Sequence, residues 1–202
     1  MENICFPPVD EWEGLIYNKN VRQCRLLEEK EEKKRRNSMK RTLLILGAGQ
    51  YGSVAYEIAN AMNCFEKIAF LDDSSERAIG KLSMYAELKG EFTHAVVAIG
   101  KTSVRMQWLA KLRAAGYHLD PLIDPRAYVS PTSRIGGGTI IEPYAVVQPN
   151  ATIGRGCLIC SGSVLKHNSH VSDGCYIDAN AVVIPRAIVP HDFKVECGKV
   201  FG

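Results

Sequence analysis

One histidine interrupts a regular pattern of prolines in the C-terminal part of the chain. The prolines are separated by 18 or 36 residues, and His167 stands where a fourth one would fall. The three prolines are Pro131, Pro149 and Pro185. Imidazole titrates near neutral pH and can accept a proton from an attacking amine or hydroxyl. We therefore expect His167 to act as a general base; the alternative is an exposed corner histidine with no chemical task.

A second candidate site is a glycine motif, G-x-G-x-x-G, formed by Gly47, Gly49 and Gly52. It follows the apolar run 42–46 and precedes a predicted helix from 53 to about 62. Such a loop lets the backbone approach a phosphate, which the N–H groups and dipole of the helix N-terminus attract. Asp72 lies 20 residues after the last glycine, where an acidic residue commonly holds a ribose hydroxyl. The alternative is a tight turn in a scaffold domain.

The element that must position His167 is a repeat of six residues. Every sixth residue from 129 to 195 is aliphatic: Val129, Ile135, Ile141, Val147, Ile153, Ile159, Leu165, Val171, Ile177, Val183, Val189 and Val195. A small side chain stands two residues before each, and Phe193 is the exception. Period six predicts a parallel β-helix built from hexapeptides.

Three hexapeptides close one triangular coil, so the repeat predicts about four coils in which residues 18 apart stack at the spacing of a sheet, roughly 4.8 Å. The aliphatic positions would fill the interior and the small ones would relieve the corners. Phe193 falls in the last coil, where we expect an aromatic plug. The period leaves the handedness of the coil open.

The residues before the repeat have an α/β pattern. Strands are predicted at 42–46, 67–71 and 94–99, with helices from 53 to about 62 and from 101 to about 116. Strands that alternate with helices predict a small doubly wound parallel sheet. About 85 residues are few for the two nucleotide-binding halves of a nicotinamide domain, which disfavours a dehydrogenase.

Composition excludes several classes of protein. The chain has 202 residues, is 46% hydrophobic and carries a formal net charge of +3, which is ordinary for a globular protein and predicts no nucleic-acid partner. It contains no apolar run of about 18 residues that could span a membrane, and no apolar core of a secretory signal. We expect a cytoplasmic protein without membrane insertion.

Residues 28–36, EEKEEKKRR, predict a solvated helix within an N-terminal extension.

The seven cysteines do not indicate a metal site. Cys157 belongs to the small inner positions, so Cys157 and Cys160 should point to different sides of the coil wall despite their C-x-x-C spacing. His167 and His170 flank one face, but His191 is offset in the repeat, so a zinc site of converging histidines is not expected.

The outward-facing residues form one column on each face of the prism, and the columns differ in polarity. One column contains Tyr128, Val146, Val164 and Val182, and another contains Ile140, Leu158, Tyr176 and Lys194. Apolar outer columns need a cover. We expect the cover to be further copies of the same prism in a homotrimer, with His167 at the corner next to the apolar face.

At this point the chain resembles a family, the sugar O- and N-acetyltransferases of the sialic acid and bacillosamine type. The matching stretches are Leu44-Ile45-Leu46-Gly47-Ala48-Gly49 with Gly52, Phe70-Leu71-Asp72-Asp73, Val97-Ala98-Ile99-Gly100 followed by Arg105, Ile123-Asp124-Pro125-Arg126-Ala127, and Leu165 to Asp173. The resemblance implies a Rossmann-like domain followed by a left-handed parallel β-helix, and it covers about residues 41–202. The expected domains are an extension at 1–40, a nucleotide-sugar-binding domain at 41–125 and an acyltransferase β-helix at 126–202.

The resemblance also implies roles for individual residues. The first domain would bind a UDP-sugar, and acetyl-CoA would lie between neighbouring prisms of the trimer. Substrate-binding residues are then expected at Gly47, Gly49, Gln50, Tyr51, Gly52, Asp72, Asp73, Gly100 and Arg105. We expect Val164, Tyr176 and Val182 to contact acetyl-CoA, His167 to be the general base and Asn168 to orient its ring. No metal is expected.

This chain departs from the family pattern at three positions. It has Tyr51 and Tyr176 where the family usually has histidines, and Asn168 where the family has an acidic residue. The leading hypothesis is acetyl transfer from acetyl-CoA to an amine or hydroxyl of a nucleotide-activated sugar, in surface polysaccharide or glycan synthesis. The alternatives are a weakened or inactive sugar-nucleotide-binding protein with the same fold and an NAD(P)-binding oxidoreductase.

Overall fold

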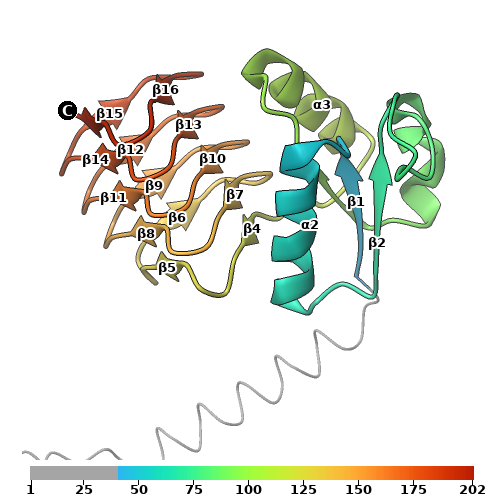
Figure 1. Ribbon diagram of the computed structural model, residues 1–202, viewed down its shortest axis with the longest axis horizontal. Helices are drawn as coiled ribbons and strands as arrows, with labels where there is room; N and C mark the ends of the chain where they lie inside the picture. Colours follow the sequence, from blue (N-terminus) through green and yellow to red (C-terminus); the bar gives the residue numbers. More distant parts are fainter. Residues whose placement is uncertain (1–40) are drawn as a thin grey trace, which may run out of the picture. The chain divides into compact units, whose positions relative to one another are not determined.

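The computed structural model describes residues 41–202, an α/β unit followed by a parallel β-helix (Figure 1). The predicted charged helix at 28–36 lies outside the described residues. No helix in residues 41–202 combines the length and the apolar character that a membrane crossing requires.

The α/β unit contains one parallel sheet of three strands. The strands are β1 (Thr42–Leu46), β2 (Lys67–Leu71) and β3 (His94–Val97), in the order β2-β1-β3. The three strands were predicted, but β3 ends two residues earlier than the predicted strand. The carbonyl groups of Ile99 and Gly100 instead accept hydrogen bonds from Arg105, at 2.9 and 2.8 Å.

Two helices cover opposite faces of this sheet. Leu43 and Ile45 of β1 pack with α2 (Gln50–Met62), whereas Leu44 and Leu46 pack with α3 (Thr102–Ala114). The sheet is therefore doubly wound, as predicted. Helix α2 begins at Gln50, inside the glycine motif, and not at Ser53 as predicted. Two short 3₁₀ helices, η2 (Leu82–Tyr85) and η3 (Glu87–Gly90), lie between β2 and β3.

The solenoid consists of two-residue strands in three parallel sheets, which we call sheets B, C and D. Sheet B contains β4 (Leu122–Ile123), β7 (Ile140–Ile141), β10 (Leu158–Ile159), β13 (Tyr176–Ile177) and β16 (Lys194–Val195). Sheet C contains β5 (Tyr128–Val129), β8 (Val146–Val147), β11 (Val164–Leu165), β14 (Val182–Val183) and β17 (Val200–Phe201). Sheet D contains β6 (Arg134–Ile135), β9 (Thr152–Ile153), β12 (His170–Val171) and β15 (Ile188–Val189).

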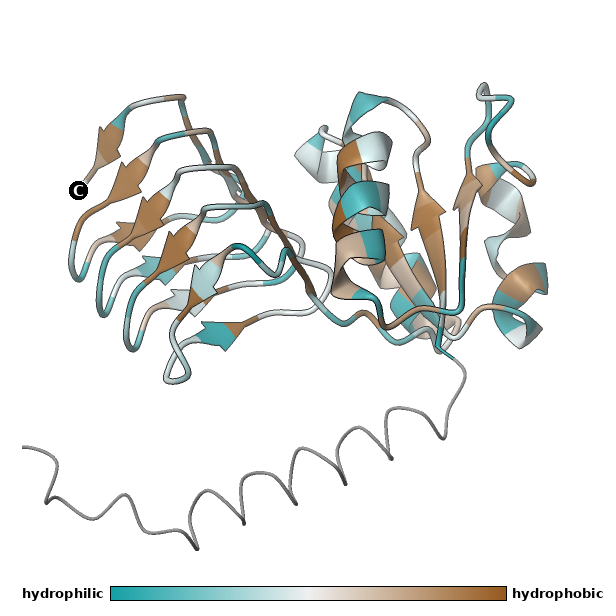
Figure 2. Ribbon diagram, turned by 60° about the horizontal axis from the view of Figure 1, so that its bottom comes forward, coloured by the Kyte–Doolittle hydropathy of each residue, from teal (hydrophilic) through white to brown (hydrophobic). Residues whose placement is uncertain are grey.

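The register of these sheets confirms the 18-residue stacking. Leu165 pairs with Val147 on one side and with Val183 on the other, and the same interval holds in sheets B and D. The second residue of each strand points inward and forms an aliphatic core along the prism, visible as repeated apolar strands in Figure 2. The small corner residues, such as Ala145, Cys157 and Ser163, are fully buried.

The repeat continues one strand further at each end than the predicted repeat. Ile123 of β4 precedes Val129 by six residues, and Phe201 of β17 follows Val195 by six. Phe193 lies in the last coil, as expected, but it packs edge-on against Phe201, with ring centroids 5.3 Å apart. The aromatic plug is therefore a pair of rings.

Many corners of the solenoid turn through a residue with left-handed backbone conformation. Glycine and asparagine supply most of these positions because they tolerate positive φ at little cost. Two large side chains also adopt it: Tyr144, with φ 64°, and Arg186, with φ 65°.

The outer face of sheet B is covered by the chain's own helix α2. Ile140 and Leu158 are fully buried and belong to the same cluster as Ala55 and Ile58, with Tyr176 packed against it. The expectation that this column contacts a second prism was therefore wrong. The sequence showed that an apolar column needs a cover, but not which element provides it.

Candidate functional site

The glycine motif forms a tight turn that joins β1 to α2. Gly47 has φ 101°, and a Cβ there would lie 2.9 Å from the carbonyl oxygen of Ala98. A Cβ on Gly52 would lie 2.2 Å from the carbonyl oxygen of Gly47. These two glycines therefore allow the loop and helix to pack closely, which is a structural role.

Gly49 is different, because a Cβ there would meet no atom within 4 Å. Gly49 is the N-cap of α2 and has no side chain to cap it, so the N–H groups of the first helical turn remain available to an anion. Gln50 is exposed beside it, and a Cβ on Gly100, beyond β3, would also meet open space. Gly49, Gln50 and Gly100 thus border an open edge at the carboxyl ends of β1 and β3.

The two aspartates that follow β2 are bound to the protein backbone. One oxygen of Asp72 accepts from the N–H of Ala48 at 2.8 Å, and the other accepts from the N–H groups of Ser74 and Ser75. These bonds, first that of Ala48, lower the pKa of Asp72 below its usual value. Asp73 accepts from the N–H of Leu82 at 3.0 Å. Asp72 therefore holds the glycine loop through the N–H of Ala48. This structural role explains the aspartate without a bound ribose.

Arg105 has a structural role rather than the substrate-binding role predicted for it. Its side chain is fully buried, and its guanidinium donates to the carbonyl groups of Ile99, Gly100, Gly156 and Gly174 and to the hydroxyl of Thr102. These acceptors satisfy all five N–H groups of the guanidinium. Arg105 therefore joins α3 to the same corner of the solenoid in two successive coils. Its guanidinium has no donor left for a ligand.

Tyr51 and Tyr176 meet between α2 and the solenoid. The hydroxyl of Tyr51 is buried and has no hydrogen-bond partner within residues 41–202. Burial, with Cys160 and Glu142 nearby, raises the pKa of Tyr51 well above its usual value. Glu142 accepts from the N–H and the hydroxyl of Ser161, each at 3.0 Å. Burial next to this carboxylate raises the pKa of Cys160 to about 12, so the thiol stays protonated. Tyr176 is thus on a different face from Val164 and Val182.

Arg77 is a residue near the glycine loop that the sequence analysis missed. It is exposed, donates to the hydroxyl of Ser53 at 2.8 Å, and lies over the ring of Phe70 at 4.7 Å. Ser53 belongs to the first turn of α2, so this guanidinium lies beside the anion-binding end of the helix. The only signal in the sequence is a base in the loop after β2.

His167 and Asn168 lie together on an exposed corner that joins sheet C to sheet D. The amide Nδ2 of Asn168 lies 3.0 Å from Nδ1 of His167, and the N–H of His167 donates to the side chain of Gln148 at 3.1 Å. Asn168 has φ 60°, like Asn150 one coil earlier, with φ 59°. An asparagine amide can rotate to present nitrogen or oxygen, so Asn168 can serve either imidazole tautomer.

An apolar stripe runs along sheet C next to this corner. It consists of the outward-facing residues Tyr128, Val146, Val164, Val182 and Val200. Tyr128 is 56% exposed and Val200 is 67% exposed, so the protomer leaves both ends of the stripe open. Val164 and Val182 lie on this stripe, with Val164 three residues before His167.

The described residues hold no cluster of three or more histidine, cysteine or carboxylate side chains arranged to bind a metal ion. Cys157 points into the core, where its thiol lies 3.1 Å from the carbonyl oxygen of Ser172, whereas Cys160 faces Glu142. The two thiols thus point to different sides of the wall.

Comparison with known proteins agrees with this two-part architecture. The PglD N-terminal domain matches residues 42–112, and the bacterial transferase hexapeptide family, in its six-repeat form, matches residues 132–167. The chain therefore contains a region similar to the PglD N-terminal domain and a region similar to the hexapeptide repeats of bacterial transferases. No curated protein sequence matches the chain.

Several solved structures share the fold of this chain. The acetyltransferase domain of PglB from Neisseria gonorrhoeae, in complex with acetyl coenzyme A, superposes with a TM-score of 0.78 at 27% identity, over 80% of this chain and 82% of that one. PerB from Caulobacter crescentus, in complex with CoA and GDP-perosamine, has a TM-score of 0.69 at 24% identity, over 80% and 88%. WeeI from Acinetobacter baumannii has a TM-score of 0.55 at 18% identity, over 81% and 95%. The solenoid is accordingly the left-handed β-helix that was expected.

Proposed function

We propose that the protein transfers the acetyl group of acetyl-CoA to an amine or hydroxyl of a nucleotide-activated sugar. The observation that carries this proposal is the exposed His167–Asn168 pair, in contact at 3.0 Å, on a hexapeptide solenoid joined to a PglD-type domain. The PglB domain, which is 27% identical, was crystallised with acetyl coenzyme A, and this supports the same acetyl donor here.

The reaction needs one base and no acyl-enzyme. Nε2 of His167 accepts the proton of the acceptor N–H or O–H, while the acceptor lone pair attacks the thioester carbonyl carbon. The carbon–sulfur bond then breaks, and the CoA thiolate takes the proton from the imidazolium. For Nε2 to be the base, Nδ1 must carry the ring proton, and the amide oxygen of Asn168 accepts a hydrogen bond from this Nδ1–H when it faces the ring.

The nucleotide would bind at the open edge of the α/β unit. We expect the diphosphate at the first turn of α2, with Gly49, Gln50 and Gly100 at the border and Arg77 beside it. Asp73 and the exposed part of the loop after β2 would contact the ribose or base. A three-stranded sheet has half the strands of the six-stranded nicotinamide domain, which argues against the oxidoreductase alternative.

A homotrimer would complete the site. The apolar stripe on sheet C lies next to His167, and a neighbouring prism packed against it would form a cleft for acetyl-CoA lined by Val164 and Val182. Tyr176 faces α2 and is not expected to contact acetyl-CoA.

We propose that the protein is located in the cytoplasm, where nucleotide sugars and acetyl-CoA are made.

The test is a thiol-release assay with acetyl-CoA and a panel of UDP- and GDP-linked amino sugars. Wild-type protein should release CoA with at least one acceptor, and His167→Ala should lower turnover about 100-fold or more, the usual contribution of a positioned base. His170→Ala, an exposed histidine on the next strand, is the control and should retain activity. Nucleotide binding without turnover in any variant would favour the binding-protein alternative.

A further inference from the structure

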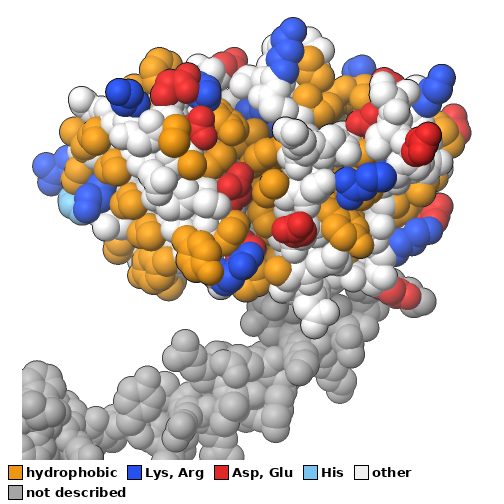
Figure 3. Space-filling model, viewed as in Figure 1, with side chains coloured by type: hydrophobic (Ala, Val, Ile, Leu, Met, Phe, Trp, Pro, Cys, Tyr) orange, Lys and Arg blue, Asp and Glu red, His pale blue; other side chains and the backbone are white. Residues whose placement is uncertain are grey.

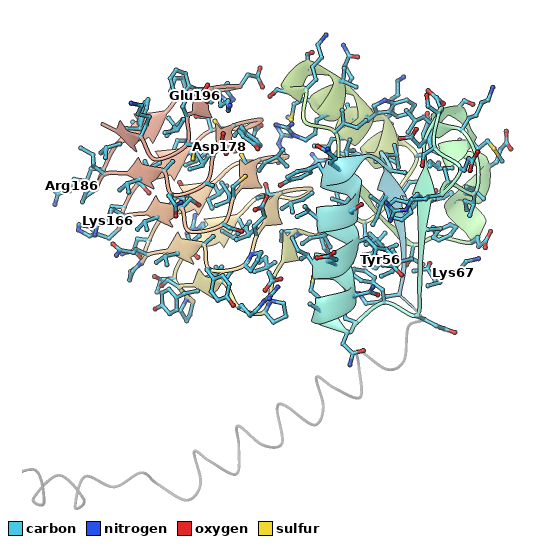
Figure 4. All side chains as sticks on the ribbon, viewed as in Figure 1. Tyr56, Lys67, Lys166, Asp178, Arg186 and Glu196 are labelled. Carbon is cyan, nitrogen blue, oxygen red and sulfur yellow. The ribbon has the colours of Figure 1, made fainter. Side chains whose placement is uncertain are left out.

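Charge is unevenly distributed over the three corners of the solenoid. All acidic residues between 122 and 202 lie in corners that follow strands of sheet B or sheet D: Asp124, Glu142, Asp173, Asp178, Asp192 and Glu196. The corner between sheets C and D comprises residues 130–133, 148–151, 166–169 and 184–187, and we call it the C–D corner. It contains His167, Lys166 and Arg186 and no acid. Figure 4 shows Lys166 and Arg186 projecting from one edge, away from Asp178 and Glu196.

Both bases of the C–D corner lie next to His167. Lys166 precedes it in the chain, and Arg186 stacks one coil beyond Asn168, whose amide contacts the imidazole ring. One coil corresponds to roughly 4.8 Å, so both cationic side chains can reach the space in front of His167. In Figure 3 the same edge carries neighbouring basic and histidine side chains.

The two bases differ in their partners from three other bases of the solenoid, whereas Arg134 and Lys199, outside the C–D corner, likewise form no ion pair within residues 41–202. Arg126, Arg155 and Lys194 pair with carboxylates at 2.9, 2.5 and 3.2 Å. Within residues 41–202, no carboxylate forms an ion pair with Lys166 or Arg186. Arg186 also occupies a left-handed position where one coil earlier the chain has asparagine. A large residue in a strained conformation is an indication of function.

We propose that Lys166 and Arg186 bind an oxyanion carried by the acceptor sugar, next to the group that His167 deprotonates. This inference rests on the proposed acetyl transfer. A guanidinium presents a planar fork that matches a carboxylate or phosphate, and a lysine adds a point charge. The anion also offsets repulsion between these two cations and the imidazolium that forms during the reaction.

The acceptor, rather than acetyl-CoA, supplies this anion. The thioester must lie at His167 during the reaction, and the whole pantetheine arm separates it from the phosphates of CoA. Because the diphosphate of the acceptor is expected at the first turn of α2, the oxyanion at this corner is a carboxylate on the sugar ring, as in a uronic acid. Such a carboxylate lies within one sugar ring of the reacting amine or hydroxyl.

The experiment compares acceptor kinetics for matched sugars. A UDP-linked amino sugar with a neutral ring and its counterpart with a ring carboxylate are assayed with wild-type protein and with the double variant Lys166→Ala, Arg186→Ala. The KM for the acceptor should rise about 10-fold or more, as for loss of charge-assisted hydrogen bonds, while the KM for acetyl-CoA stays unchanged. Lys199→Ala, an exposed base outside this corner, is the control and should change neither value.

A second variant separates binding from folding. Arg186→Gly places at this corner a residue that tolerates positive φ, so it should raise the melting temperature. It also removes the guanidinium, so it should raise the KM for the acceptor. A rise confined to the carboxylated sugar supports the inference, whereas an equal rise for both sugars would show that these bases contact the diphosphate and would overturn it. An unchanged acceptor KM, or a rise in the KM for acetyl-CoA alone, overturns the inference. Wild-type protein that acetylates no acceptor overturns the proposed function, and this inference with it.

Discussion

Nε of Arg105 donates to the carbonyl oxygen of Gly156 over 2.7 Å, inside a fully buried contact between α3 and the solenoid. A second bond from the same guanidinium reaches the carbonyl oxygen of Gly174, one coil further, at 2.9 Å. The side chain of Arg105 therefore joins the α/β unit to the solenoid, and all of its N–H groups donate to acceptors of this chain.

Arg105→Leu should destabilise the protein by about 3 kcal/mol or more, because several buried carbonyl groups lose their donor at once. The measurement is urea-induced unfolding followed by circular dichroism. Arg113→Ala, an exposed arginine on the same helix, should change the midpoint little. Equal midpoints for the two variants would contradict the role assigned to Arg105.

Gly49→Val should abolish nucleotide binding without unfolding the protein. A Cβ at this position would meet no atom of residues 41–202 within 4 Å, and we expect the valine side chain to occupy the space through which a phosphate approaches the first turn of α2. Calorimetry with UDP and GDP measures the effect. Gly90→Val, at another glycine with open space around it, should retain wild-type affinity. Preferential binding of NADH by wild-type protein would favour the oxidoreductase alternative instead.

Asn168→Asp should raise turnover if the enzyme is weakened by its asparagine. A carboxylate can only accept from Nδ1–H, so it fixes the tautomer in which Nε2 is free to take a proton, and it stabilises the imidazolium. The acidic limb of the pH–rate profile should move to higher pH for the same reason. Turnover below that of wild type, with an unmoved profile, would exclude this role for Asn168.

Val164→Glu should dissociate the proposed trimer, because it would bury an unpaired charge in the contact between prisms, at a penalty of several kcal/mol. Light scattering measures the mass in solution. Ile188→Glu is the matched control: Ile188 is 68% exposed on the outer face of sheet D and should tolerate the change. A monomeric wild-type protein would end this hypothesis.

The buried His94 should make stability depend on pH. Burial, and secondarily the neighbouring Arg41, lower the pKa of His94, whose Nε2 lies 3.1 Å from the Arg41 guanidinium. The folded state therefore favours neutral imidazole, and its stabilising effect is lost as the pH falls from about 6.5 through the folded pKa, because the unfolded chain binds the proton first. His94→Gln should flatten the decrease in unfolding free energy between pH 7.5 and 5.5, whereas His191→Gln should not.

The solenoid could be predicted from the sequence because its interior admits only one pattern. Each inner position, from Val129 to Val195, faces the same narrow prism and must be aliphatic, so the period appears directly in the chain. The limits of the repeat were less clear. Ile123 fits the aliphatic period, but it precedes an aspartate and a proline and was assigned to the connection before the repeat, whereas Phe201 is aromatic and did not match the aliphatic pattern.

The candidate site was predicted less completely, for two physical reasons. A buried arginine satisfied by backbone carbonyl groups has no sequence signature, so Arg105 resembled a ligand-binding residue. The columns ending in Val182 and in Tyr176 are both apolar, and only the folded chain shows that α2 covers the second one. His167 was found because it departs from the column of prolines. Arg186 stands in the next column, after Asn150 and Asn168, and was overlooked.

The stacking of residues 18 apart restricts how this chain can change in length. An insertion of one residue in any corner would turn every later inner side chain toward solvent, whereas an insertion of 18 would add a coil and leave every column in register. Such a change would alter the spacing between His167 and the α/β unit in whole steps of one coil. Divergence in this architecture should therefore proceed by duplication or loss of complete coils. Each such event would change the distance between His167 and the α/β unit, and with it the length of substrate that can reach both.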